Sequence, residues 1–195
     1  MTTILNDNQI ASLAQNGMIS PFVPQVTRVI DGKKIISYGC GSYGYDIRLS
    51  PKQFKIFNHI PGEVVDPKIF NPKFLKDSEL HSDEHGQYFI LPAHSYGLGV
   101  AMERLEMAPN VTAICIGKST YARAGIIANL TPVEAGWTGH LTIEISNSSS
   151  ADCRIYAGEG IAQLLFLQGD DCNVTYQDRQ GKYQDQPESV VFSKV

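Results

Sequence analysis

The sequence lacks long hydrophobic runs, closely spaced cysteine pairs and an excess of positive charge. No apolar stretch in its 195 residues reaches the roughly 18 residues that a membrane-crossing helix needs. The first seven residues show no basic start or apolar stretch typical of a secretory signal, so we expect a cytoplasmic protein with no membrane partner. A net charge of −4 disfavours a broad nucleic-acid surface, which needs a basic field. A small anionic ligand is still compatible, because a few local cations can bind it.

The four cysteines, Cys40, Cys115, Cys153 and Cys172, are widely separated and form no C-x-x-C motif. Reduced thiols are the expected state in a cytoplasmic chain. Cys115 lies in an apolar run and is therefore predicted to be a core residue.

Several common catalytic motifs are also missing. Gly117-Lys118-Ser119 is similar to the end of a P-loop, but residue 112 is threonine where that loop needs glycine. The H-x-E and P-C-x-x-C motifs of zinc nucleobase deaminases are absent, and no G-x-S-x-G supports a serine nucleophile. The nearest metal-like cluster is His81–His85, for which a solvated loop is the favoured interpretation.

The hydropathy pattern predicts a single, mainly β domain spanning residues 1–195. Short apolar or alternating runs are separated by glycines, prolines and Asn/Asp/Ser clusters, which favours an all-β barrel or sandwich. The predicted strands include residues 45–49, 53–57, 87–91, 154–156 and 160–167.

Three further segments have their own signals. A short N-terminal surface helix is predicted, with Asn6 and Gln9 forming a capping box and Gly17 ending the helix. Residues 61–84 are predicted to form a long excursion with one helical turn near residues 73–75. The polar segment from about 178 to 195 is predicted to be a flexible C-terminal arm.

Residues 117–126 are the first candidate site. Lys118 and Arg123 flank two hydroxyl side chains between two apolar runs. Ser119 or Thr120 is placed to cap a helical turn whose free N–H groups would face an anion. The two cations would add charge-assisted bonds to phosphate. An exposed polar turn explains the local pattern about equally well.

Residues 136–147 are the second candidate site. Strand alternation places Glu144 on one face with Thr142 and Ser146, opposite an apolar row formed by Leu141, Ile143 and Ile145. A carboxylate between small hydroxyl groups in mid-strand is unusual. A solvent-facing strand residue is nevertheless the commoner case, so the pattern alone assigns no role to Glu144.

These segments together resemble the dCTP deaminases, members of the dUTPase-like superfamily. The matching segments are residues 36–39, 42–48, 117–126, 139–147, 160–166 and 176–186, in this order along nearly the whole chain. The likeness is greatest to the bacterial branch with the form G-K-S-T-Y-A-R. The resemblance implies a distorted β-barrel or jelly roll of the dUTPase type, and a homotrimer with active sites shared between subunits.

The resemblance also implies a reaction: hydrolysis of dCTP to dUTP and ammonia in pyrimidine deoxynucleotide synthesis. Mg²⁺ would be bound through the substrate triphosphate, with no zinc, and dTTP would be a feedback inhibitor. Carried over by position, Glu144 is the proton donor and acceptor. The implied substrate-binding residues are Lys118, Ser119, Thr120, Tyr121, Ala122, Arg123, Thr142, Ile143, Gln163, Tyr176, Lys182 and Gln186. Of these, residues 118–123 would form a phosphate-side loop, and Lys182 and Gln186 would fold over the triphosphate.

Residues 129–134 depart from the family pattern, because they lack a His-Arg pair that some deaminases carry there, and we assign that loop no role. Glu134 lies near the position of the aspartate that activates water in a dUTPase. A bifunctional enzyme that converts dCTP to dUMP and pyrophosphate is therefore the main alternative, and a pure dUTPase is more distant. A non-catalytic nucleotide sensor or a structural β protein explains less, since Glu144 is present. Burial would raise the pKa of Glu144 and Arg123 would lower it, and the sequence does not decide between them.

Overall fold

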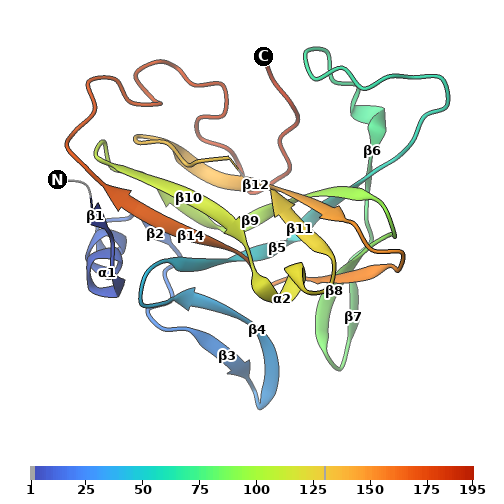
Figure 1. Cartoon of the computed structure of the whole chain (residues 1–195), viewed down its shortest axis with the longest axis horizontal. Coiled ribbons are helices and arrows are strands. Elements are labelled where there is room, and N and C mark those ends of the chain that lie inside the picture. Colours follow the sequence, from blue (N-terminus) through green and yellow to red (C-terminus); the bar gives the residue numbers. More distant parts are fainter. Residues whose placement is uncertain (1–2, 130) are drawn as a thin grey trace.

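The computed structural model describes residues 3–129 and 131–195, which are mainly β (Figure 1). The helices are α1 (Asp7–Gln15), the 3₁₀ turn η1 (Pro72–Phe74) and α2 (Ser119–Ala122). The strands are β1 (Thr3–Ile4), β2 (Ile19–Ser20), β3 (Thr27–Ile30), β4 (Lys33–Cys40), β5 (Tyr45–Phe57), β6 (Leu75–Asp77), β7 (His81–Asp83), β8 (Gly86–Leu91), β9 (Tyr96–Glu106), β10 (Val111–Gly117), β11 (Ile126–Asn129), β12 (Thr138–Asn147), β13 (Cys153–Tyr156) and β14 (Gly160–Gln168). All the strands predicted from the sequence fall within these ranges.

One large antiparallel sheet forms most of the molecule and curls into an open, distorted barrel (Figure 1). Its main path is β1-β14-β5-β9-β12-β11, and β10 pairs with β14. The curl brings β10 back towards the segment after β11, where Ala113 and Val133 exchange backbone hydrogen bonds of 2.9 and 2.8 Å. Strands β13, β8 and β7 form a separate three-stranded sheet. The predicted mainly β, distorted-barrel fold is confirmed.

Strand β5 is longer than its sequence suggested. Its two predicted runs, residues 45–49 and 53–57, form one strand that continues through Pro51. The register of β5 against β9 shifts between Leu49 and Phe54. Proline has no N–H to donate to a sheet, and strand prolines therefore occur at such irregularities or at edges. The register shift lets the two ends of this single strand pair in different parts of the barrel.

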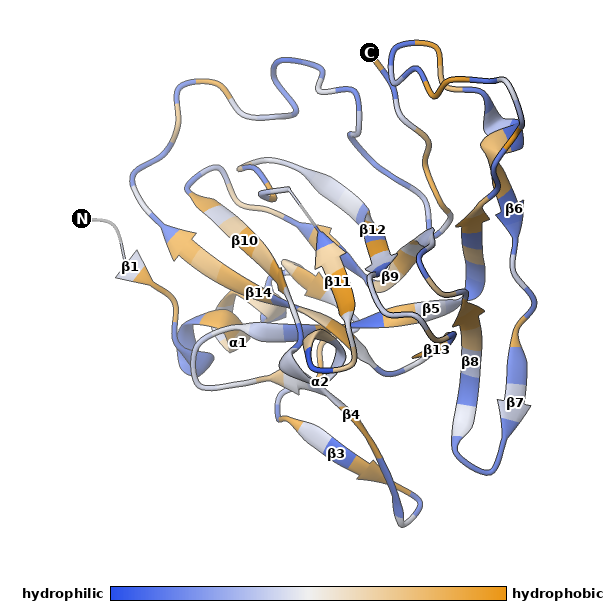
Figure 2. Cartoon of the chain, turned by 45° about the vertical axis from the view of Figure 1, so that its right-hand side comes forward, coloured by the Kyte–Doolittle hydropathy of each residue, from blue (hydrophilic) through white to orange (hydrophobic). Residues whose placement is uncertain are grey.

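The interior is filled by large apolar side chains. Tyr45, Phe54, Phe89 and Phe166 are among the largest fully buried residues. Figure 2 shows hydrophobic residues concentrated on the strands of the curled sheet, whereas the segment after β14 is mostly hydrophilic. A second, smaller cluster joins Leu75, Leu98 and Val190, with four aromatic side chains packed against it, Phe57, Phe70, Tyr96 and Phe192.

The predicted N-terminal helix is confirmed in detail. The Asn6 side chain accepts a hydrogen bond from the Gln9 backbone, and the Gln9 side chain accepts one from the Asn6 backbone, which completes the capping box. The helix ends at Gln15, and Gly17 follows with a φ of 95°. Ile10 and Ala14 anchor the helix on the core.

Other local predictions have mixed outcomes. The excursion contains the expected helical turn at η1. The stretch from His81 to His85 is not a plain loop, because its first three residues form β7 of a hairpin with β8. The four cysteines are free, and Cys115 is buried as predicted. Among the residues that the structure describes, no helix is long and apolar enough to cross a membrane.

The C-terminal arm follows β14, crosses above β10 and β12, and returns towards β12 (Figure 1). Its returning end packs on the smaller cluster through Val190 and Phe192. Trp137 Nε1 donates a 2.7 Å hydrogen bond to the Tyr183 carbonyl, and the Val191 N–H donates a 3.2 Å bond to Thr142 Oγ1. Val190 is buried in the smaller cluster. The structure thus gives the arm a defined docking position, and its flexibility remains a prediction.

Candidate active site

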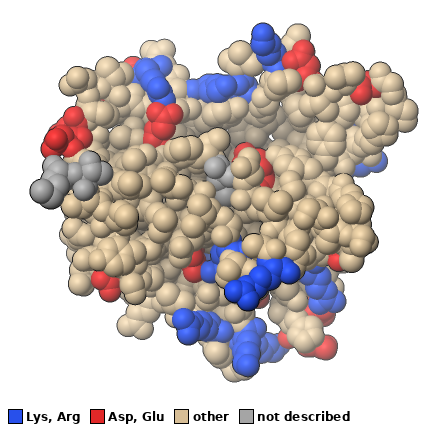
Figure 3. Space-filling model, viewed as in Figure 1, with Lys and Arg blue, Asp and Glu red and all other residues tan. Residues whose placement is uncertain are grey.

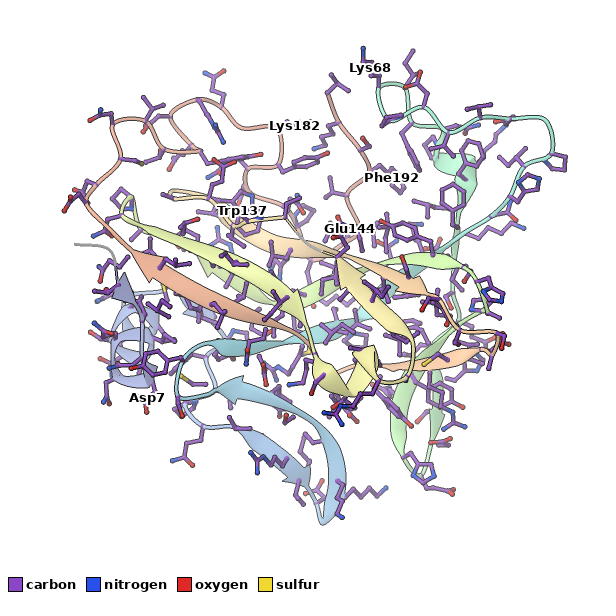
Figure 4. All side chains as sticks on the ribbon, viewed as in Figure 1. Asp7, Lys68, Trp137, Glu144, Lys182 and Phe192 are labelled. Atoms are coloured by element: carbon purple, nitrogen blue, oxygen red, sulfur yellow. The ribbon has the colours of Figure 1, made fainter. Side chains whose placement is uncertain are left out.

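A cleft of about 930 Å³ opens between β12, the C-terminal arm and the aromatic cluster. The described residues that line it include five of the predicted site residues, which are Thr142, Glu144, Tyr176, Lys182 and Gln186. Figure 4 shows Glu144 on the sheet below the returning end of the arm. Phe192 lies above Glu144, and Lys182 lies higher in this view, on an earlier part of the arm. The structure therefore brings together the strand carboxylate and the predicted arm residues.

Strand β12 presents Glu144 to the cleft through its alternation. Ile143 and Ile145 are fully buried, whereas Thr142 and Glu144 are half-buried and line the cleft. Any contact of Ile143 with a base or sugar must therefore use its backbone. Leu141 is an exception to the predicted apolar row, because it also lines the cleft. The register of β12 against β9 shifts between His140 and Thr142, which interrupts the alternation there.

The Glu144 carboxylate is poised to exchange a proton near neutral pH. Burial raises its pKa from an ordinary value of 4.5 to about 7, and a hydrogen bond from its own backbone offsets only part of this shift. No described side chain forms a hydrogen bond or ion pair with it. Within one chain, burial therefore sets the direction of the shift in the pKa of Glu144, and Arg123 does not reverse it. The negative charge of Glu144 also acts on Tyr96. Burial and this charge together raise the pKa of the Tyr96 hydroxyl to about 12.

The arm contacts β12 at a glycine. Gly139 has a φ of 131°, and a Cβ added there would lie 2.5 Å from the Gln186 backbone nitrogen. The bare α-carbon lets the arm run beside the strand, where the His140 N–H donates to the Gln186 carbonyl at 3.0 Å. Thr142 Oγ1 then donates to the Gln186 side chain at 3.1 Å. Gln186 is thereby held over the cleft by both its backbone and its side chain.

Charged groups lie at the rim of the cleft. Arg179 forms an ion pair with Glu134 and lies over the Tyr176 ring at 5.1 Å. Lys182 is exposed and donates to the Lys194 carbonyl at 2.6 Å. Two cations thus flank a cleft that also contains a carboxylate of raised pKa. This arrangement suits a ligand with an anionic tail and an uncharged ring.

The other predicted residues lie elsewhere in the chain. The described lining of the cleft includes none of residues 118–123, nor Ile143 or Gln163. Strand β11 explains the separation, because Asn129 pairs with Glu144 at one end and Ile126 pairs with Asn147 at the other. Helix α2 precedes Ile126 and lies at the lower end of β11 in Figure 1.

The segment around α2 differs from its prediction in one respect. Neither Ser119 nor Thr120 caps the helix, because Lys118 is the N-cap residue and makes no side-chain capping bond. Thr120, with Ser119, Ala122 and Arg123, is exposed. The capping prediction was wrong because the extended backbone of β10 continues one residue farther than the hydroxyl pattern suggested.

Tyr121 is a structural residue in this fold. Its side chain is buried, and its hydroxyl accepts a 2.8 Å hydrogen bond from the Tyr156 N–H. Burial raises its pKa well above the ordinary range. Tyr121 therefore anchors α2 to β13, and any ligand contact it makes must come from its backbone.

Basic side chains gather beside α2. Figure 3 shows several Lys and Arg side chains at the lower edge of this face, over α2 and the β3–β4 hairpin, whereas acidic and basic groups are scattered elsewhere on the face. A local gathering of cations on a chain of net charge −4 matches the expectation of a small anion site.

Several cleft residues were not expected from the sequence. Trp137, Tyr96 and Tyr183 line the cleft, as do Phe192 and Arg179. The single tryptophan, between two glycines in Gly136-Trp137-Thr138-Gly139, was a usable signal. Phe192 had no such signal, because nothing in a polar tail indicates that its last aromatic residue packs on Phe70 with ring centroids 5.8 Å apart.

Comparison with known proteins shows the family to which the chain belongs. The model of the dCTP deaminase-like family matches residues 4–169. The chain belongs to the dCTP deaminase-like family. It is 50% identical over 186 residues to a dCTP deaminase of Acidovorax sp. (strain JS42), covering 94% of this chain and 95% of that protein. It is 47% identical over 195 residues to a dCTP deaminase of Dechloromonas aromatica (strain RCB), covering 99% of this chain and 100% of that protein.

A solved structure supports the fold. The 2′-deoxycytidine 5′-triphosphate deaminase from Agrobacterium tumefaciens superposes with a TM-score of 0.58 at 19% identity. The match covers 86% of this chain but 48% of that one, so this chain spans about half the length of that protein. At this identity the likeness concerns the barrel alone.

Proposed function

We propose that the protein hydrolyses dCTP to dUTP and ammonia, supplying dUTP for dUMP and dTTP synthesis in the cytoplasm. The observation that carries the proposal is Glu144, a half-buried carboxylate that lines the cleft and whose pKa is raised to about 7 by burial. Full-length relatives named dCTP deaminase, at about half identity, support the same reaction.

Glu144 supplies proton transfer in this proposal. Its carboxylate accepts a proton from water as the water oxygen bonds to C4 of cytosine, and it passes that proton to N3, which gives a neutral tetrahedral intermediate. Glu144 then accepts the proton of the new C4 hydroxyl and delivers it to the amino group, and the C4–N bond breaks to release ammonia and leave the C4 carbonyl of uracil. Such general acid–base catalysis contributes on the order of 10²–10⁴ in rate. The remaining acceleration comes from holding water and base in position and from fixed dipoles around C4.

The other residues bind the substrate in this proposal. Thr142 and the backbone of Ile143 lie against the base and sugar. Lys182, Tyr176 and Gln186 close over the triphosphate from the arm, and they already line the cleft. Residues 118–123, together with Gln163, hold the phosphates from a neighbouring subunit, with Ser119 and Arg123 close to the reacting end.

Magnesium enters with the triphosphate in this proposal. Mg²⁺ is commonly held by substrate phosphates and water with few protein carboxylates. Among the described residues, no cluster of three or more His, Cys, Asp or Glu side chains is placed to ligate a metal. The bound cation would neutralise phosphate charge, and the residues of the chain perform the proton transfers.

We propose a homotrimer with shared sites, which would reunite the two predicted halves of the site that one chain holds apart. Three apolar side chains on adjacent strands, Ile114, Ile116 and Ile127, are 46%, 42% and 54% exposed. They lie on β10 and β11, beside α2. Covering this surface with a second copy would bury them and bring an α2 segment to another subunit's cleft. dTTP, which shares the triphosphate and a pyrimidine ring, is proposed to bind the same site as an inhibitor.

Product analysis tests the reaction. The purified chain is incubated with dCTP and Mg²⁺, and nucleotides are separated by ion-exchange chromatography while ammonia is assayed. Equal amounts of dUTP and ammonia are expected. Absence of both, with an active dCTP deaminase as a positive control, contradicts the proposal.

A bifunctional enzyme is the second candidate, because Glu134 lines the same cleft. Its carboxylate is held in an ion pair with Arg179, a contact that must break before Glu134 can approach a water molecule. The same incubation separates the two candidates. Accumulation of dUTP supports the monofunctional enzyme, and dUMP with pyrophosphate supports the bifunctional one.

The pKa of Glu144 predicts the pH dependence of the reaction. Its carboxylate must be ionised to accept a proton from water, and its pKa is about 7. We therefore expect kcat/KM for dCTP to fall about tenfold per pH unit below that value. A glutamate of ordinary pKa would keep its activity to near pH 4.5. The measurement is kcat/KM between about pH 5 and pH 9 at constant ionic strength, and a profile that stays flat to pH 5 contradicts the assignment.

A further inference from the structure

Asp46 is a buried carboxylate outside the cleft whose two oxygens both bind predicted substrate residues. It lies on β5 and is 7% exposed. Lys118 Nζ lies 2.5 Å from Asp46 Oδ2, and Gln163 Nε2 donates to Asp46 Oδ1 at 3.0 Å. The ion pair is itself buried, with side-chain exposures of 10% for Lys118 and 9% for Asp46. One side chain thus connects two residues that are far apart in sequence.

The strand register creates this meeting point. Asp46 pairs with Gln163 between β5 and β14, and Gln163 pairs with Ile116 between β14 and β10. Directly paired residues project to the same face of a sheet, so Asp46 and Gln163 emerge side by side. Lys118 follows two residues after Ile116 and reaches back over β14.

Gly160 makes room for the lysine. A Cβ added at Gly160 would lie 3.2 Å from Lys118 Cδ and 1.9 Å from the Ser37 carbonyl oxygen. The bare glycine therefore lets β4 and the lysine side chain approach the same point. Lys118 Nζ also donates to Ser37 Oγ at 3.3 Å.

The chemistry of these groups fixes their orientation. An ionised carboxylate only accepts hydrogen bonds, so Gln163 must turn its amide N–H towards Asp46 and its oxygen away. An ammonium group has three N–H donors. Two are directed to Asp46 and Ser37, which leaves one for a phosphate oxygen. A lysine side chain that is not held in this way loses rotamer entropy when it binds a ligand.

We propose that Asp46 is a positioning residue that holds Lys118 and Gln163 ready for the substrate. Its negative charge opposes the attraction of Lys118 for a polyanion, so its benefit lies in orientation before binding and not in added charge. The inference rests on the proposed function, because residues 118 and 163 are given there as substrate contacts.

A double-mutant cycle tests the proposal in the full-length enzyme. The variants are Asp46→Asn, Lys118→Gln and the double substitution, and steady-state kinetics are measured with dCTP and Mg²⁺. We expect Asp46→Asn to raise KM about 10- to 100-fold, the range of a charge-assisted hydrogen bond, with little change in kcat. In the Lys118→Gln background the same change should raise KM much less, since only the contact between Asp46 and Gln163 then remains to be lost.

A matched substitution separates this role from general effects. Asp83→Asn removes an equal charge from an ion pair with Arg154 outside the cluster and should leave KM unchanged. If Asp46→Asn lowers the melting temperature because Lys118 is left unpaired, the double variant, which removes both charges, should recover it. Equal increases of KM in both backgrounds would show a merely structural role. An unchanged or lower KM in Asp46→Asn would show that Asp46 competes with phosphate, and either result overturns the proposal.

Inorganic tripolyphosphate separates failure of this inference from failure of the proposed reaction. Thermal stabilisation by tripolyphosphate depends on the anion site and not on deamination. The wild-type protein should be stabilised, and both Asp46→Asn and Lys118→Gln should lose most of the shift. Loss in Lys118→Gln but not in Asp46→Asn overturns the positioning role whether or not dCTP is a substrate.

Discussion

Replacing Glu144 by glutamine is expected to lower kcat for dCTP by about 10²–10⁴-fold while leaving nucleotide binding nearly unchanged. Glutamine keeps the size of the side chain but cannot accept a proton from water. Among the described residues no carboxylate is hydrogen-bonded to Glu144, and Glu134, the other carboxylate of the described cleft lining, is engaged by Arg179. The measurement is kcat from ammonia release, together with Kd for dCTP from calorimetry.

Glu84→Gln is the matched control for this variant. It makes the same chemical change at a side chain that is 83% exposed on the β7–β8 turn, away from the cleft. Its kcat and KM should equal those of the wild-type protein. Near-normal ammonia release from Glu144→Gln would remove Glu144 from the reaction, and weak dCTP binding by the variant would point to a role in recognition.

Mixing two inactive variants is expected to restore activity if the site is shared between subunits. Glu144→Gln disables the cleft half, and Arg123→Ala disables the exposed α2 half. In a closed ring, an intact site needs Glu144 from one subunit and Arg123 from its neighbour. Random assembly from equal amounts gives each condition about half the time, so about a quarter of all sites are intact, and about a third are intact in mixed trimers, where one pairing in three combines the two.

The experiment uses co-expression of the two variants with different affinity tags, followed by tandem purification of mixed oligomers and an ammonia assay. The control is Glu144→Gln co-expressed with itself under both tags. A site formed within one chain predicts no gain, because every subunit then carries one defect. Activity that stays at the sum of the separate variants would therefore contradict the shared site.

Local physics explains which parts of this fold the sequence could predict. The capping box at Asn6 and the alternation around Glu144 depend on neighbours within a few residues, and both predictions were confirmed, except that Leu141 also lines the cleft. The continuity of β5 through Pro51 depends on its pairing with β9, which no local pattern encodes. For that reason one strand was predicted as two separate runs.

The site was harder to predict because the fold of the barrel and the arm brings together residues that are far apart in sequence. Glu134 and Tyr176 reach one cleft only because the arm turns back over β12. Asp46 lies 72 residues before its partner Lys118, and only the order of strands β5, β14 and β10 brings them together. The resemblance to a family supplied residue roles, and the structure showed that one chain holds these residues in two separate places.

The burial of Glu144 has a consequence for the resistance of the protein to denaturation. Its pKa is about 7 in the folded chain and near 4.5 when unfolded, so the folded state binds the proton more tightly. The protonated side chain therefore favours folding fully below pH 4.5, and this advantage is lost as pH rises through 7. The difference is about 2–3 kcal/mol after allowance for partial contact with water. Glu144→Gln should thus melt at a higher temperature than the wild-type protein at about pH 8 by calorimetry, with the gap closing in acid. The Glu144 carboxylate thus lowers the free energy of unfolding above its pKa, and we attribute its presence at this position to its proposed role in proton transfer.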